Sequence, residues 1–141
     1  MSRGLRRNAA ALCSVFAWIT APGALALADE LAAPFFSQAQ ADRGADIYQD
    51  HCATCHGEHL NDGAFAGALK GAAFKRHWTG KTLGALGQFI LANMPPGKAG
   101  QLTEGQYTDV IAFLILANGV KAGGPDLPAD PQAWERLAAP R

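Results

Sequence analysis

Cys52-Ala53-Thr54-Cys55-His56 is the stretch that decides the fold, because it follows the C-x-x-C-H pattern of covalent haem attachment. Side chains three residues apart lie on nearly the same face of a helical turn, so both thiols can each add to one vinyl group of a single haem. His56 then projects its imidazole beneath the iron as the proximal ligand. The stretch predicts one covalently bound haem c per chain, held by Cys52, Cys55 and His56.

Two other kinds of site share part of this pattern. A C-x-x-C redox pair usually lies at the end of a strand in a β-α-β unit, and the sequence shows no such unit. A structural zinc site needs four protein ligands, and His59 or His77 would have to supply the missing nitrogens. The spacing lacks a paired second half, which favours haem over zinc.

Met94 is the expected sixth ligand of the iron. It follows a predicted helix and precedes Pro95 and Pro96, and a residue before proline is driven out of the α region. A stiff, extended loop of this kind can hold a thioether at a fixed distance from iron. The alternatives are a methionine that only fills a gap in the core, or ligation by one of the histidines: His51, His59 and, as the best rival, His77.

Length and composition allow one small domain with a targeting segment. The chain has 141 residues, of which 49% are hydrophobic and 17% charged, and its formal net charge is zero. This apolar content excludes a disordered chain. The neutral balance argues against a nucleic-acid binder that works by bulk electrostatics, and three cysteines cannot build a disulfide scaffold.

Residues 1–28 have the pattern of a secretory signal peptide. A positive start is followed by an apolar run and by Ala26-Leu27-Ala28, which fits the cleavage rule and makes Asp29 the predicted first residue of the mature protein. Ala24-Leu25-Ala26 is the alternative cleavage motif. An uncleaved anchor is the alternative, but the apolar run is shorter than the ~20 residues that span a bilayer. Cleavage removes three arginines and no acids, which gives a net charge of −3. We therefore expect a periplasmic protein without stable membrane insertion.

Three main helices are predicted in the domain over residues 38–119. The first begins at Gln38 behind an N-cap at Ser37, and the second covers about residues 82–93. The third starts with a capping box between Thr103 and Gln106 and ends at about Ala117. Its expected inward stripe consists of apolar side chains at helical spacing: Tyr107, Val110, Phe113, Leu114 and Ala117.

Long irregular segments are expected around these helices. Residues 29–37 form a short apolar leader, residues 57–78 a long loop with one helical turn at most, and residues 94–102 a loop rich in Pro and Gly. Residues 120–141 form a Pro-rich C-terminal tail, predicted to be extended or weakly ordered.

In combination, these residues resemble class I cytochrome c. The family pattern has a glycine and an aromatic residue one turn apart, here Gly44 and Tyr48, and then the attachment motif followed by Gly57. Met94-Pro95 follows, and an apolar-aromatic-Leu element lies in the last helix at 112–114. The resemblance covers residues 38–119. It implies a small all-α cytochrome c fold, with three main helices and long loops around one covalently bound haem.

The resemblance also implies roles for single residues. Gly44 would allow close packing against Phe113 where the first and last helices cross. Trp78 would donate its indole N–H to a haem propionate or cover the haem edge. The stretches at 78–82 and 93–97 are similar to small cytochromes that accompany quinoprotein dehydrogenases.

The expected function is one-electron transfer by a six-coordinate haem iron held by His56 and Met94, without enzymatic activity. The donor would be a dehydrogenase and the acceptor an oxidase or another cytochrome, reached by a monomer or by a small subunit of a complex. Permanent attachment to a dehydrogenase is one alternative, and a peroxidase-like or gas-binding haem protein is another. Basic side chains before the second helix are a candidate docking patch: Lys70, Lys75, Arg76 and Lys81.

Overall fold

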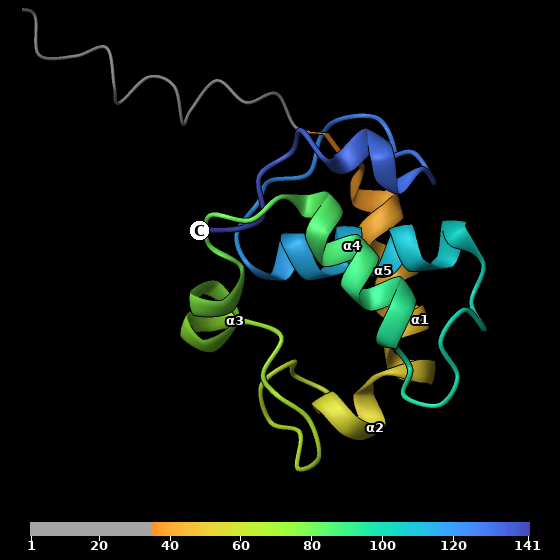
Figure 1. The fold of residues 1–141 in the computed structure, drawn as a ribbon, viewed down its shortest axis with the longest axis vertical. Helices are drawn as coiled ribbons and strands as arrows, with labels where there is room; N and C mark the ends of the chain where they lie inside the picture. The colour runs from red at the N-terminus through yellow and green to blue at the C-terminus, as the bar shows by residue number, and fades with distance from the viewer. Residues whose placement is uncertain (1–34) are drawn as a thin grey trace, which may run out of the picture. The chain divides into compact units, whose positions relative to one another are not determined.

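The structure, a computed structural model, describes residues 35–141 and is all-α in this range. The predicted signal peptide and most of the predicted leader lie outside the described residues. The helices are α1 (Gln38–His51), α2 (Ala53–His56), α3 (Gly71–Trp78), α4 (Leu83–Asn93), α5 (Glu104–Ala117) and the short 3₁₀ helix η1 (Pro131–Trp134) (Figure 1). The described residues contain no strand, only one isolated antiparallel bridge between Thr82 and Ala138. The predicted fold class is confirmed.

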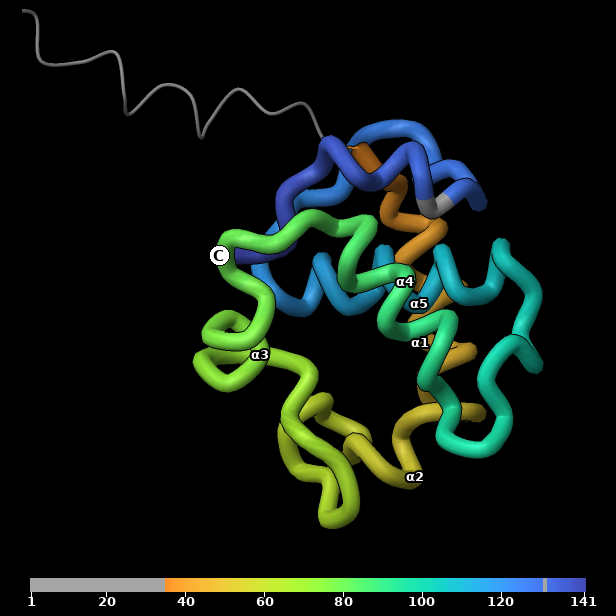
Figure 2. The backbone as a smooth tube through the Cα atoms, in the orientation of Figure 1, coloured from red at the N-terminus to blue at the C-terminus, as the bar shows by residue number. Residues whose placement is uncertain are grey.

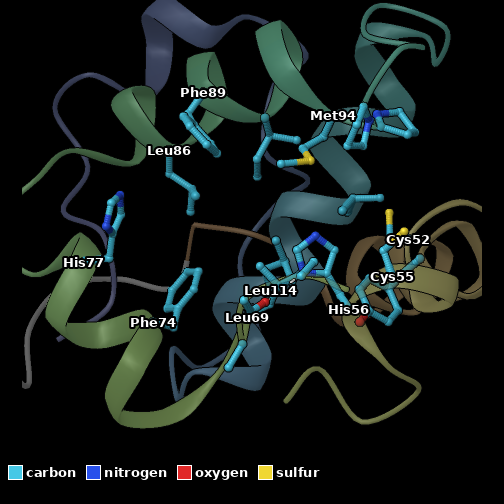
Figure 3. Close-up of a pocket in the computed structure, with 18 of the residues that line it drawn as sticks. Cys52, Cys55, His56, Leu69, Phe74, His77, Leu86, Phe89, Met94 and Leu114 are labelled. Carbon is cyan, nitrogen blue, oxygen red and sulfur yellow. Dashed lines mark hydrogen bonds between the residues drawn. The ribbon is translucent and has the colours of Figure 1, made fainter. Parts of the chain in front are cut away.

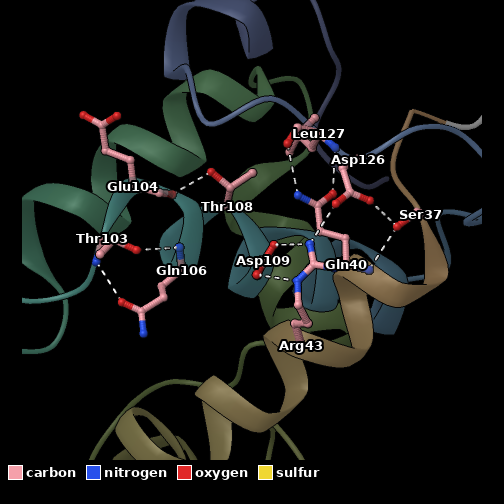
Figure 4. Close-up of polar contacts among 10 residues, drawn as sticks. All are labelled: Ser37, Gln40, Arg43, Thr103, Glu104, Gln106, Thr108, Asp109, Asp126 and Leu127. Atoms are coloured by element: carbon pink, nitrogen blue, oxygen red, sulfur yellow. Dashed lines mark hydrogen bonds and ion pairs between the residues drawn. The ribbon is translucent and has the colours of Figure 1, made fainter.

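The predicted helix starts are confirmed by side chains that cap the first turns. The Ser37 hydroxyl accepts a hydrogen bond from the backbone N–H of Gln40 at 3.0 Å, and the Thr82 hydroxyl accepts one from Ala85 at 3.0 Å. Thr103 and Gln106 form both hydrogen bonds of a capping box at the start of α5 (Figure 4). These local signals place three of the helices correctly.

The main helix pair is α1 with α5, and Gly44 lies where their backbones meet. A Cβ atom at Gly44 would lie 1.9 Å from the carbonyl oxygen of Asp109 and 3.0 Å from the Cβ atom of Phe113. Only a residue without a side chain fits this crossing, as the family resemblance implies, although the backbone of Asp109 is nearer than Phe113.

Helix α5 is buried around more of its surface than the sequence predicted. Ile111 and Ile115 are fully buried although the expected stripe omits them, while Ala117 is exposed. The reason is that α5 packs against α1 on one side and α4 on another. A helix with neighbours on two sides loses the single apolar stripe of a surface helix.

The predicted long loop over residues 57–78 is corrected by helix α3, which occupies its last eight residues. Phe74 and Trp78 are its buried residues, four positions apart on one face. Trp78 stacks edge-on against Phe89 of α4, with ring centroids 5.7 Å apart. Aromatic side chains thus attach helix α3 to α4, the helix that follows it in the chain.

The C-terminal segment packs on the domain, so the prediction of an extended or weakly ordered tail is wrong. Trp134 in η1 is 1% exposed and rests on α4 at Gly87, where a Cβ atom would lie 2.5 Å from its ring. Its indole N–H donates to the carbonyl of Pro128 at 2.8 Å. Figure 2 shows this segment running over the ends of α1 and α4 and finishing beside the turn between α3 and α4.

Polar side chains fix the same segment to α1 and α5. The amide of Gln40 forms two buried hydrogen bonds with the backbone of Leu127, at 3.0 and 2.7 Å. Arg43 holds Asp109 at 2.9 Å and Asp126 at 2.8 Å, and Ser37 also donates to Asp126 (Figure 4). These hydrogen bonds lower the pKa of Asp126, with Ser37 as the larger cause. The first half of α1 is therefore joined to the C-terminal segment at residues 126 and 127.

Candidate haem-binding site

A cavity of about 460 Å³ lies between the attachment motif, helix α3 and helix α4. Its volume falls within the usual range of small-molecule and cofactor sites. Cys52, Cys55, His56 and Met94 all line it, which brings together four of the predicted site residues (Figure 3). The wall is otherwise largely apolar, with Leu69, Phe74, Leu86, Ile90 and Leu114 among its members. Shape and donor set fit a haem attached at one end.

His56 is oriented by the loop that follows it. Its Nδ1 atom lies 2.8 Å from the backbone carbonyl oxygen of Gly67, so Nδ1 carries the proton and donates. This hydrogen bond fixes the tautomer in which Nε2 is unprotonated and free to bind a metal. Figure 3 shows His56 and Met94 pointing toward one another across the cavity. The arrangement suits a proximal and a distal ligand.

Glycines hold the loop close to the attachment motif. A Cβ atom at Gly63 would lie 2.2 Å from the carbonyl oxygen of Cys55 and 2.4 Å from the carbonyl carbon of His56. Gly57, directly after the motif, has φ +84°, a conformation that favours glycine. The loop can therefore turn back over the motif and reach His56 only with these two glycines.

Cys52 and Cys55 are free, partly buried thiols. Burial, and to a smaller extent the neighbouring Cys55, raises the pKa of the Cys52 thiol to about 11. A redox-active C-x-x-C pair has the opposite property, a thiol with a lowered pKa. The environment of Cys52 therefore argues against the disulfide-exchange reading of the motif.

Met94 caps the C-terminus of α4 in the extended conformation that its place before proline predicts, with φ −122° and ψ 141°. Its carbonyl accepts a hydrogen bond from the hydroxyl of Tyr107 at 2.7 Å. That hydroxyl also accepts from the backbone N–H of Gly100 at 2.9 Å. Helix α5 thus holds the Met94 loop through Tyr107, a role that no motif in the sequence indicates.

Trp78 lines the cavity from α3 and is 7% exposed. The Nζ atom of Lys81 lies 4.7 Å from the centre of its ring, in cation–π geometry. The position fits both roles predicted for Trp78, contact with a propionate and cover of the haem edge, and both stay predictions. Tyr48 also lines the cavity and donates to the carbonyl of Gly57 at 2.6 Å, and burial raises its pKa to about 12.

The histidines named as alternative ligands take different positions. His51 and His77 are exposed residues that line the cavity, whereas His59 does not line it. The His77 ring lies edge-on to Trp78, with centroids 4.9 Å apart. Among residues 35–141, no three His, Cys, Asp or Glu side chains converge as they would around a zinc ion.

The structure reveals two groups at the site that the sequence analysis missed. The carbonyl of Gly67 orients His56, and Tyr107 holds Met94. A backbone acceptor leaves no signal in the sequence, and Tyr107 looks like one more apolar position of an amphipathic helix.

None of the helices in the described part of the chain has both the length and the apolar character needed to span a bilayer.

Comparison with known families agrees with this geometry. Residues 39–114 match the family model described as cytochrome C oxidase, cbb3-type, subunit III. The match includes the attachment motif, Met94 and most of α5. Comparison with curated proteins gives no significant match, and neither does comparison with solved structures. The match to more than half of the chain shows that this protein belongs to that family of c-type cytochrome domains.

Proposed function

We propose that the protein is a periplasmic one-electron carrier in which His56 and Met94 bind the iron of a haem attached to Cys52 and Cys55. The supporting observation is that all four side chains line one cavity, with His56 held in the tautomer that leaves Nε2 free. When bound, the haem supplies reversible one-electron chemistry at its iron. The family match supports a haem c electron carrier.

The chain's own residues have four tasks in this function. Cys52 and Cys55 fix the haem in place, Gly67 orients His56, and Tyr107 keeps Met94 within reach of the iron. The cavity is lined largely by apolar side chains, and burial of the haem among them would, together with methionine ligation, favour a raised reduction potential. With His56 and Met94 both bound to the iron, substrates would have no open position on the metal, in keeping with transfer rather than catalysis.

The expected partners are a dehydrogenase as donor, with a quinoprotein dehydrogenase as the specific candidate, and an oxidase or another cytochrome as acceptor. The patch of Lys70, Lys75, Arg76 and Lys81 supports docking to acidic surfaces. The signal-peptide pattern over residues 1–28 supports export to the periplasm.

A second candidate is a subunit held permanently in a complex. The family that the chain matches is described as subunit III of an oxidase, which favours this candidate. Gel filtration of the native protein separates the two candidates, because a free carrier elutes at the size of one chain and a subunit elutes with its complex.

The absorption spectrum of the purified protein tests the axial ligands, measured oxidised and reduced, for the wild type and for Met94→Leu. Leucine keeps the apolar volume and removes only the sulfur. The wild type should be low-spin, with the weak long-wavelength band of a sulfur–iron bond, and the variant should lose this band and become high-spin while its haem stays covalently bound. A variant spectrum identical to that of the wild type would exclude Met94 as a ligand. His77→Gln is the matched control and should leave the spectrum unchanged.

A further inference from the structure

Helix α4 lies between the haem-binding cavity and the C-terminal segment. Three of its apolar side chains line the cavity (Figure 3): Leu86, Phe89 and Ile90. Its glycines face the C-terminal segment instead. A Cβ atom at Gly84 would lie 2.5 Å from the carboxyl carbon of Glu135, and a Cβ atom at Gly87 would lie 2.5 Å from the ring of Trp134. With 3.6 residues per turn, the two sets of positions lie on opposite faces of the helix.

The C-terminal segment that backs α4 is fixed on both sides of Trp134. Before it, the backbone of Leu127 is hydrogen-bonded to Gln40 of α1. After it, the carbonyl of Leu137 accepts a hydrogen bond from the N–H of Leu83 at 2.7 Å. Trp134 itself is 1% exposed, so its ring has no free space into which it could turn. Trp134 is therefore a rigid support for the face of α4 that points away from the cavity.

Glu135 joins the same segment to the beginning of α4. Its carboxylate accepts hydrogen bonds from the hydroxyl of Thr82 at 3.1 Å and from the amide of Gln88 at 2.8 Å. Thr82 is the N-cap residue of α4, so this negative charge lies at the positive end of the helix dipole. The first turns of α4 are thus held in place by polar contacts as well as by packing.

Met94 is the C-cap residue of α4, about two turns after Gly87. Tyr107 holds its carbonyl from α5, but the helix that carries it packs more extensively on η1 than on α5. A shift of α4 relative to the C-terminal segment would therefore move Met94 relative to His56 across the cavity.

We propose that Trp134 is a positioning residue for Met94, which keeps the thioether on the iron by supporting α4 at Gly87. The proposal rests on the proposed function and adds to it a residue beyond the range of the family match, which ends at residue 114. Without this support α4 has more freedom to move, and Met94 leaves the iron in a larger fraction of the molecules. The sixth position of the iron is then open to an added ligand.

The test is the binding of free imidazole to the oxidised, haem-loaded protein, measured as the loss of the sulfur–iron band. Imidazole binds only those molecules whose Met94 has left the iron, so its apparent affinity rises in proportion to their fraction. Trp134→Leu should bind imidazole at least threefold more tightly than the wild type. Gly44→Ala is the control for a general loss of stability. Its methyl group disturbs the crossing of α1 and α5, so the melting temperature should fall while the imidazole affinity stays unchanged.

Gly87→Ala is a second variant that keeps the proposal testable if Trp134→Leu does not fold. Alanine favours a helix over glycine, so helix propensity alone predicts a variant at least as stable as the wild type. Its Cβ atom would instead meet the ring of Trp134 and push α4 toward the cavity, which should raise the imidazole affinity at least threefold. Combining Gly87→Ala with Trp134→Leu removes this clash, and the double variant should bind imidazole more weakly than either single variant.

Two results would overturn the positioning role of Trp134. One is an imidazole affinity equal to that of the wild type in both Trp134→Leu and Gly87→Ala. The other is an equal rise in affinity in Gly44→Ala, which would show that any loss of stability releases Met94. In both cases the sulfur–iron band of the wild type is present and the proposed function stands. A wild type without this band would instead reject the ligation by Met94 on which the proposed function depends.

Discussion

The hydroxyl of Tyr107 joins α5 to the Met94 loop by donating to the carbonyl of Met94 at 2.7 Å. It also accepts from Gly100, so one phenol holds both sides of the turn that follows α4. Tyr107 is 2% exposed, and water cannot easily take its place. The position of the proposed distal ligand therefore depends on a residue thirteen positions later in the chain.

Removing this hydroxyl should lower the stability of the fold and weaken the bond between Met94 and the haem iron. Tyr107→Phe leaves the Met94 carbonyl and the Gly100 N–H without their partner, which we expect to cost about 1–3 kcal/mol in the free energy of unfolding. The sulfur–iron band should also disappear at a lower temperature than in the wild type. Thr108→Val is the control, since it removes a hydroxyl bonded within α5 to the carbonyl of Glu104. If both variants lost the band at the same temperature, Tyr107 would have no special role at Met94.

Gly63, in the loop after the attachment motif, and Gly105, in α5, offer a matched pair of substitutions. Gly63→Ala places a methyl group against the backbone of Cys55 and His56, whereas a Cβ atom at Gly105 meets nothing nearer than the Thr103 hydroxyl at 4.0 Å. Gly63→Ala should lower the yield of haem-loaded protein severalfold, and Gly105→Ala should leave it unchanged. Yield is read as covalent haem per unit of protein. Equal yields for the two variants would show that the loop can move away from the motif at little cost.

The close crossing at Gly44 predicts a large effect on stability. Gly44→Leu forces α1 away from the backbone of Asp109, and overpacking of this kind costs about 1–3 kcal/mol or more. The melting temperature and the yield of haem-loaded protein should both fall. Asp46→Leu adds the same side chain at an exposed position of α1 and serves as the control. Equal melting points and yields would reject the packing role of Gly44.

Asp126 makes stability depend on pH. Hydrogen bonds from Ser37 and Arg43 lower its pKa in the folded protein, so it contributes stability that is present above the pKa of the unfolded chain and is lost as the pH falls through the lower, folded value. Asp126→Asn should therefore melt below the wild type at pH 7, and the difference should shrink toward zero in acid.

The control for this prediction is Asp46→Asn, at an exposed carboxylate with no hydrogen bond among the described residues. Melting curves from pH 7 to pH 2 give the comparison. A gap between wild type and Asp126→Asn that stayed constant over this range would show that the ionised carboxylate contributes nothing.

Local signals explain what could be predicted from the sequence. Ser37, Thr103 and Gln106 act on backbone within three residues of themselves, so their caps can be read without knowing the fold. The attachment motif and the pre-proline Met94 are equally local, and the structure brings them to one cavity. Their binding to haem iron stays a prediction until the spectrum is measured.

What the sequence did not reveal depends on distant partners. Helix α3 has only Phe74 and Trp78 as buried residues. Phe74 packs against Trp78, and Trp78 packs against Phe89 of α4. Trp134 looks like an isolated aromatic residue in a Pro-rich tail, yet it is buried because Gly87 leaves room on α4. Such contacts depend on shape, which a pattern along one chain does not encode.

The two hydrogen bonds between Gln40 and Leu127, 87 positions apart, bear on which parts of the sequence can vary without loss of the fold. Hydrogen bonds and helix packing join α1, α5 and the C-terminal segment, while the loop that orients His56 and helix α3 lie between α1 and α5 in the sequence. That stretch can acquire substitutions or altered loop lengths at a modest entropy cost while its ends stay fixed. The residues that join α1, α5 and the C-terminal segment are thus largely different from those that orient His56 and line the haem cavity. Related chains could therefore differ in reduction potential and in redox partner while they keep the same fold.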